Sequence, residues 1–143
     1  STLRHTLFPY TTLFRSGKNH RFGLHDAVMI KDNHLEAVDS LPEAITRLRQ
    51  SLGHTVKIEV EVDTLSRLEE VLSLDIDIVL LDNMDPETLR KAVSIVDGRV
   101  ITEASGNVDL EKVREIAMTG VDYISSGALT HSAENLDIGA DHE

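Results

Sequence analysis

The chain contains no cysteine, so disulfide bonds, thiolate metal sites and cysteine nucleophiles are excluded. It also lacks any apolar run near the ~20 residues that span a bilayer, and nothing in it resembles a secretory signal with a cleavage site. At 143 residues it can bury a core, but it is shorter than the ~250 residues typical of a complete α/β barrel. We therefore expect a cytoplasmic protein without a membrane segment, either one compact domain or part of a larger protein.

Positive charge is scarce, because 14 Lys and Arg stand against 25 Asp and Glu, a net charge of -11. This balance argues against non-specific binding of nucleic acid, whose phosphates such a surface repels. Residues 1–31 are the exception, with five basic side chains and one acidic one. An anionic ligand therefore has to meet a local cationic cluster, and Lys18, Arg21 and Lys31 are the candidates.

Residues 1–16 differ in character from the rest of the chain. The stretch "TLFPYTTLFRS" has neither a helical period nor a two-residue period, and it resembles the in-frame translation of a common sequencing-library adapter. We expect residues 1–16 to be a non-native segment and leave them out of the fold reasoning. On this interpretation the native sequence begins near Gly17 and some upstream sequence has been lost.

Strand and helix patterns alternate from residue 40 onward. Strands are predicted at "VKIEVEV" (56–62), "IDIVLLDN" (76–83), "RVITEASG" (99–106) and the start of "VDYISSGALTH" (121–131), with one more at residues 27–30. The later strands recur about every 21 or 22 residues with a helix between them. Such a βα repeat predicts a parallel sheet with right-handed crossovers.

Helix boundaries follow from capping signals. Ser40 and Glu43 have the spacing of a capping box, and Gly53 is the predicted stop of that helix. Asp85 and Pro86 are predicted as N-cap and first residue of a helix that ends at Gly98. A helix with Leu65, Leu68 and Leu72 on one face and another over residues 109–120 complete the set.

The strand at residues 56–62 alternates strictly between apolar and polar side chains. If this strand belongs to a barrel covered by helices, its valines and isoleucine point outward, and Glu59 and Glu61 point into the barrel. Buried acids are costly unless they are paired or hydrated at a site. An edge strand with one solvent face is the alternative explanation.

Polar residues follow every predicted strand, at the edge where parallel α/β sheets bind ligands. The two Ser-Gly loops suit phosphate, because glycine permits close backbone approach and serine and N–H groups donate. Glu61 and Asp82 are able to accept hydrogen bonds from sugar hydroxyls or to hold hydrated Mg²⁺, although each residue in this set is also compatible with a cap or turn. We do not expect a metal site at the histidines of residues 20–34. The strand-end residues are Lys31 to His34, Glu61, Asp82, Asn83, Ser105, Gly106, Asn107, Ser126, Gly127 and Ala128.

Five blocks of the sequence resemble quinolinate phosphoribosyltransferases, also called carboxylating nicotinate-nucleotide pyrophosphorylases. They are "NHRFGLHDAVMIKDNH", "KIEVEVDTL", "IVLLDNM", "EASGNV" and "GVDYISSGALTHSAENLDIG", in family order from about Lys18 to the end. The resemblance implies an α/β fold, a TIM-like partial (β/α) barrel of parallel strands with outer helices, incomplete on its N-terminal side. Residues 17–143 would then be a C-terminal barrel domain.

The resemblance also implies a reaction and its residues. Quinolinate and phosphoribosyl diphosphate would give nicotinate mononucleotide, diphosphate and CO₂ in NAD biosynthesis, with Mg²⁺ as cofactor. His20, Arg21 and Lys31 would contact quinolinate, and Glu61 and Asp82 match acids near the ribose hydroxyls and the metal. Phosphate would be held by Ser105, Gly106, Asn107, Ser126, Gly127 and Ala128. We take Lys31, Glu61 and Asp82 as the catalytic candidates.

The chain departs from the family pattern in two respects. An N-terminal sandwich domain and a "TRK" block, whose Arg and Lys bind substrate, do not occur in it. The family forms homodimers in which a neighbouring subunit completes each site, so we expect this chain alone to be weak or inactive. Two alternatives remain, a non-catalytic phosphoribosyl-binding remnant and another phosphate-binding barrel enzyme. A molybdenum-transport-associated branch that shares the fold is one such relative, although it lacks a clean "KDNH" block.

Overall fold

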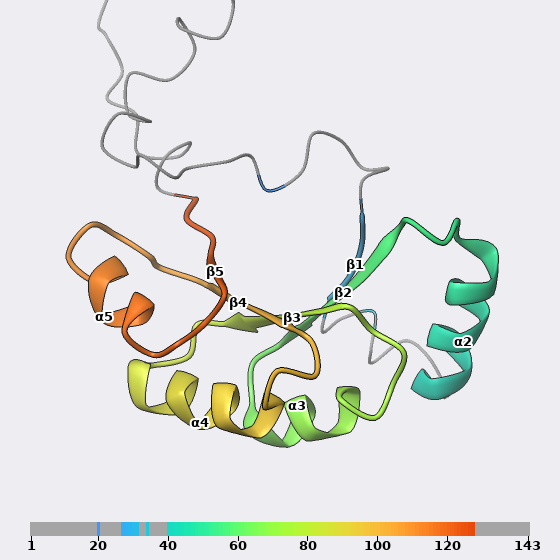
Figure 1. Ribbon diagram of the computed structural model, residues 1–143, viewed down its shortest axis with the longest axis horizontal. Helices are drawn as coiled ribbons and strands as arrows, with labels where there is room; N and C mark the ends of the chain where they lie inside the picture. The colour runs from blue at the N-terminus through green and yellow to red at the C-terminus, as the bar shows by residue number, and fades with distance from the viewer. Residues whose placement is uncertain (1–19, 21–26, 32–33, 35–39, 128–143) are drawn as a thin grey trace, which may run out of the picture.

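The computed structural model describes residues 20, 27–31, 34 and 40–127 of the chain (Figure 1). Strands and helices alternate along this part, as the βα repeat predicts. The strands are β1 (Ala27–Ile30), β2 (Lys57–Val62), β3 (Ile78–Asp82), β4 (Ile101–Ser105) and β5 (Tyr123–Ile124). The helices are α2 (Leu41–Ser51), α3 (Leu65–Val71), α4 (Pro86–Val96) and α5 (Val113–Ala117).

The five strands form one sheet in the order β1-β2-β3-β4-β5, and every neighbouring pair is parallel. Strands that follow one another in the chain therefore lie side by side in the sheet. This order is that of a barrel wall, since a doubly wound sheet reverses direction at a switch point. The predicted strand at residues 27–30 is confirmed as the edge of the described sheet.

The two faces of the sheet differ in chemistry. Ile58, Val60 and Val62 of β2 are at most 1% exposed and belong to a core that includes Leu68 of α3 and Leu89 of α4. Figure 1 shows α3 and α4 side by side along this outer face. Each such side chain contributes about 1.5–3 kcal/mol by leaving water. The predicted alternation of β2 is confirmed.

The inner face carries the acids. Glu59 is 1% exposed and Glu103 of β4 is 7% exposed, and the strand register places Glu61, Leu80 and Glu103 at one level across β2, β3 and β4. Because β2 pairs with β1 on one side and with β3 on the other, and Glu59 is buried, the edge-strand alternative for β2 is wrong.

Helix α4 has the boundaries that its sequence predicts. The Asp85 carboxylate accepts a hydrogen bond from the Thr88 N–H at 2.8 Å, and Pro86 is the first helical residue. At the other end, Asp97 and Gly98 are left-handed, with φ of 48° and 69°. The chain can therefore turn sharply into β4.

Two other helices differ from their predictions. Ser40 is the N-cap of α2, but its side chain caps no N–H, and Glu43 instead pairs with Arg47 at 3.4 Å, so the predicted capping box is wrong. Helix α2 ends at Ser51, and its extended C-cap Leu52 directly precedes Gly53, the predicted stop. Helix α5 covers residues 113–117 instead of 109–120, although the Asp109 carboxylate accepts the N–H groups of Glu111 and Lys112 in the turn just before it. Within the described residues, no helix is long and apolar enough to cross a membrane.

Candidate active site

The carboxyl ends of β1 to β4 bring the predicted site residues to one edge of the sheet. Lys31, directly after β1, places its Nζ 3.6 Å from Oε2 of Glu61 on β2. Asp82 ends β3 and is the register partner of Ser105, which ends β4. Lys31 remains 52% exposed at its side chain, whereas Glu61 is 17% exposed. A cation and two acids therefore face the same edge, with the cation open to solvent.

A hydrogen-bonded chain of side chains continues from Asp82. Asn83 Nδ2 donates to Asp82 Oδ2 at 2.8 Å, and Asn107 Nδ2 donates to Asn83 Oδ1 at 3.0 Å. The backbone N–H of Asn83 also donates to the Ser105 carbonyl at 2.9 Å. The acid that ends β3 is thus joined through Asn83 to the loop that follows β4.

Gly106 shows why this loop needs glycine. Its φ is +92°, and a Cβ built on it would collide with the Asn83 side-chain amide and lie 2.8 Å from the Asn83 nitrogen. Any other residue would have to displace Asn83. In this structure Asn83 is the group that approaches Gly106 closely, and close approach of a phosphate to this loop stays a prediction.

The loop after β5 is tied to the loop after β4. The Ser126 hydroxyl donates to the Val108 carbonyl at 2.7 Å, and the Ser125 N–H donates to the Ala104 carbonyl at 2.9 Å. Both predicted phosphate loops therefore lie next to each other at the same edge of the sheet. Gly127 is described at the end of this segment, whereas Ala128 lies outside the described residues, as does Arg21.

His20 contacts two buried acids, Glu59 and Glu103, neither of which is among the predicted site residues. Its Nε2 lies 3.0 Å from Oε1 of Glu103 and 3.6 Å from Oε1 of Glu59. The Ser125 hydroxyl also donates to Oε1 of Glu103. Residues 101–105 (ITEAS) do not alternate between apolar and polar side chains, so it is the strand register that places Glu103 level with Glu61. Their partner His20, however, lies far from both acids in the sequence, so the sequence alone does not indicate this contact.

Two sets of side chains at this site contain carboxylates that could bind a metal ion. Among the described residues, His20, Glu59 and Glu103 are the group of three whose ligand atoms lie within 4.8 Å of one another. Glu61 and Asp82, the predicted Mg²⁺ ligands, contact Lys31 and Asn83 instead. Their role toward a metal stays a prediction.

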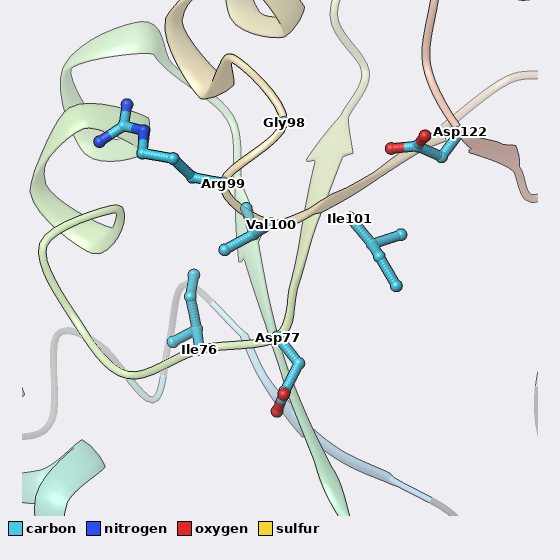
Figure 2. Close-up of a pocket in the computed structure, with 7 residues that line it drawn as sticks. All are labelled: Ile76, Asp77, Gly98, Arg99, Val100, Ile101 and Asp122. Carbon is cyan, nitrogen blue, oxygen red and sulfur yellow. The ribbon is translucent and has the colours of Figure 1, made fainter.

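A surface pocket lies at the opposite edge of the sheet, where strands begin (Figure 2). Ligands of parallel α/β folds bind at the carboxyl ends of the strands, so this pocket is separate from the candidate site. It is lined by Ile76, Asp77, Gly98, Arg99, Val100, Ile101 and Asp122.

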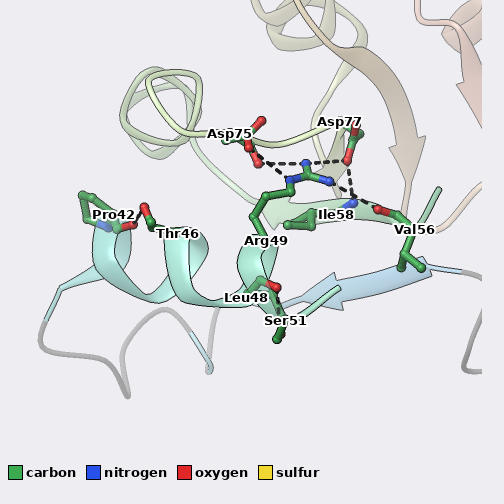
Figure 3. A network of polar contacts seen from close by, with 9 residues as sticks. All are labelled: Pro42, Thr46, Leu48, Arg49, Ser51, Val56, Ile58, Asp75 and Asp77. Atoms are coloured by element: carbon green, nitrogen blue, oxygen red, sulfur yellow. Dashed lines mark hydrogen bonds and ion pairs between the residues drawn. The ribbon is translucent and has the colours of Figure 1, made fainter. Parts of the chain in front are cut away.

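Arg49 of α2 organises the polar contacts at this amino edge (Figure 3). Its guanidinium donates to Oδ2 of Asp77 at 2.7 Å, to Oδ2 of Asp75 at 3.1 Å and to the Val56 carbonyl at 3.2 Å. Asp77 also accepts the Ile58 N–H at 2.8 Å. Burial by itself raises the pKa of Asp77, but the bonds from Ile58 and Arg49 outweigh it, so the pKa is lowered overall.

Residues 5–141 match the family model described as "Quinolinate phosphoribosyl transferase, C-terminal domain". The chain belongs to this family. The match begins within residues 1–16, whose origin in an adapter stays a prediction.

Solved structures of family members share the fold. The chain is 46% identical to a nicotinate-nucleotide pyrophosphorylase from Ehrlichia chaffeensis, with a TM-score of 0.77 over 91% of this chain and 47% of that one. It is 42% identical to NadC from Streptococcus pyogenes, with a TM-score of 0.75 over 90% of this chain and 45% of that one. The predicted α/β architecture of a partial barrel is therefore confirmed.

A curated relative gives the same family assignment. The chain is 44% identical over 147 aligned residues to a tobacco (Nicotiana tabacum) protein named quinolinate phosphoribosyltransferase [decarboxylating] 2a, mitochondrial. The alignment covers 90% of this chain and 42% of the tobacco protein. The chain thus spans somewhat less than half the length of the family members that it matches.

Proposed function

We propose that this chain supplies the barrel half of an active site that transfers a phosphoribosyl group from phosphoribosyl diphosphate to quinolinate. The products are nicotinate mononucleotide, diphosphate and CO₂, as in NAD biosynthesis. The observation that carries the proposal is the edge where Lys31, Glu61 and Asp82 lie beside the two Ser-Gly loops. We propose the two substrates from the family to which the chain belongs.

The cationic side of the edge suits quinolinate, which carries two carboxylates. Lys31 is exposed and supplies a point charge, and its contact with Glu61 is long enough for a carboxylate of the substrate to compete. His20 and Arg21 are the further proposed contacts, and Arg21 has the forked geometry that binds carboxylates in a bidentate manner. Recognition by these three groups would favour a substrate with two carboxylates.

The acidic side suits the reacting sugar. When the bond from the anomeric carbon to diphosphate breaks, positive charge develops on the ribose, and the carboxylates of Glu61 and Asp82 stabilise it electrostatically. The pyridine nitrogen forms the new bond to that carbon and becomes positively charged. The ring then accepts the electrons of the adjacent carbon–carboxylate bond as CO₂ leaves, and a proton replaces it.

The oxygen donors of Glu61 and Asp82 fit Mg²⁺, which prefers carboxylates and substrate phosphates as ligands. We propose these two residues as its protein ligands, with the ion neutralising charge on the diphosphate. We further propose that the protein acts in the cytoplasm as a homodimer. These parts of the proposal rest on the family resemblance.

Release of labelled CO₂ from carboxyl-labelled quinolinate tests the proposed function. The enzyme is expressed as the full open reading frame that encodes this chain, and CO₂ is counted with and without phosphoribosyl diphosphate. Release that depends on both substrates is the expected result, and its absence would contradict the assignment. This chain expressed alone is expected to release little or no CO₂ in the same assay.

Lys31→Ala in the full protein should raise the KM for quinolinate about 10-fold to 100-fold, because a charge-assisted contact worth about 1.5–3 kcal/mol is lost. Lys91→Ala is the matched control, since Lys91 pairs with Glu87 on the outer helix α4 at 2.7 Å. The control should leave the KM unchanged. Equal KM values in both variants would contradict a role of Lys31 in quinolinate binding.

A further inference from the structure

Asn83 contacts both groups that the proposed function assigns to the phosphoribosyl donor. Its side chain donates to the Asp82 carboxylate at 2.8 Å and accepts from the Asn107 amide at 3.0 Å. Its backbone N–H donates to the Ser105 carbonyl at 2.9 Å. One residue therefore joins the acid assigned to the sugar with the loop assigned to the phosphate.

The direction of these bonds follows from chemistry. An ionised carboxylate only accepts hydrogen bonds, so the NH₂ of Asn83 has to face Asp82. The Oδ1 of Asn83 then faces the loop, where it requires a donor, and the NH₂ of Asn107 supplies it. The three side chains thus form a directed chain of bonds in which Asn83 is the central member.

The backbone supports the same arrangement. Asn83 and Asn107 are both left-handed, with φ of 52° and 48°, and Gly106 between β4 and Asn107 has φ of 92°. Asparagine is one of the few residues besides glycine that adopts the left-handed conformation readily, so both positions suit it. Gly106 also leaves the space that the Asn83 amide occupies. Asn83 and this loop therefore hold each other in position.

We propose that Asn83 is a positioning residue that sets the Asp82 carboxylate relative to the loop 105–107, so that both meet one phosphoribosyl donor. This role rests on the proposed function. The sugar and the phosphate of the donor are covalently linked, so the spacing of their two binding groups affects donor affinity directly. Quinolinate contacts the Lys31 side of the edge, so its affinity should not depend on Asn83.

Asn83→Gly isolates the side chain, because glycine adopts the left-handed backbone freely. In the full protein we expect the KM for phosphoribosyl diphosphate to rise about tenfold and the KM for quinolinate to stay within about twofold, since a hydrogen bond to a charged group is lost. Asp97→Gly is the matched control, as it makes the same exchange at a left-handed position (φ 48°) after α4. An unchanged donor KM in Asn83→Gly would overturn the role.

Two further variants keep the test decisive if Asn83→Gly folds poorly. Asn83→Asp keeps the size of the side chain but turns an oxygen toward Asp82, so it should raise the donor KM at least as much as Asn83→Gly. A double-mutant cycle with Asn107→Ala should be non-additive, because each single change breaks the same chain of bonds. Additive effects, or wild-type donor binding in Asn83→Asp, would contradict the role. Turnover by the wild-type protein, measured first, tests the proposed function separately from Asn83.

Discussion

The two edges of the sheet use similar polar residues in different ways. At the amino edge, the Arg49 guanidinium binds the Asp75 and Asp77 carboxylates and the Val56 carbonyl. These hydrogen bonds hold α2, β2 and β3 together. At the carboxyl edge, the only described ion pair of Lys31 is a 3.6 Å contact with Glu61, and the lysine is half exposed. The polar groups at the amino edge therefore form a structural network, whereas those at the carboxyl edge can bind a ligand.

The backbone shows the same difference. Left-handed residues at the amino edge, Asp97 and Gly98, end a helix, and a Cβ at Gly98 would meet nothing within 4 Å. At the carboxyl edge, Asn83, Gly106 and Asn107 are left-handed and in mutual contact. The turn that leads into β4 therefore tolerates a side chain, whereas the turns that follow β3 and β4 are closely fitted to each other.

Gly106→Ala should have the largest effect of the changes that probe this comparison. The new Cβ would displace Asn83, and a shift of about 1 Å in such a site can cost about 100-fold in kcat/KM. Gly98→Ala is the control at the other edge, where only the left-handed strain of about 1 kcal/mol applies. Steady-state kinetics and thermal melts of both variants measure the contrast. Equal activities would mean that the two turns are equally tolerant.

Arg49→Ala should mainly lower stability. It leaves the carboxylates of Asp75 and Asp77 and the Val56 carbonyl without the guanidinium, and we expect a loss of about 2 kcal/mol in the free energy of unfolding. Urea unfolding measures this loss. Arg49→Lys keeps the charge but not the fork and should fall between wild type and alanine. Both variants should retain the wild-type KM for quinolinate. A raised KM would mean that the Arg49 network at the amino edge affects substrate binding at the carboxyl edge.

Asp77→Asn should have a smaller effect that depends on pH. Because the pKa of Asp77 is lowered from its ordinary value of 3.8 in the folded state, its carboxylate stabilises the fold above that value, and this contribution disappears as the pH falls below it. At pH 7 we expect Asp77→Asn to lose about 1 kcal/mol, since the side chain is about one-third exposed and screened by solvent. Unfolding curves of both proteins between pH 7 and pH 2.5 should converge at the acidic end. A constant difference would mean that another property of Asp77 is responsible.

Much of the fold could be predicted because its signals are local. The alternation in β2 and the Asp85-Pro86 start of α4 depend on neighbours within a few residues, and both predictions were confirmed. The capping box at Ser40 and the full length of α5 were also predicted locally but were wrong. Glu43 pairs with Arg47 instead of capping an N–H group, and α5 begins only at Val113 even though Asp109 accepts the N–H groups of Glu111 and Lys112 as a cap does.

The sequence by itself determined the order of elements, the outer apolar face, and the acids and glycine loops at the carboxyl edge. It did so because residue periodicity decides which side chains a strand or helix buries. Only the tertiary structure decided which of these groups meet: His20 with Glu103, Arg49 with Asp77, and Asn83 with Asn107. Those contacts depend on strand register and loop conformation, and cooperative packing of the whole sheet sets both.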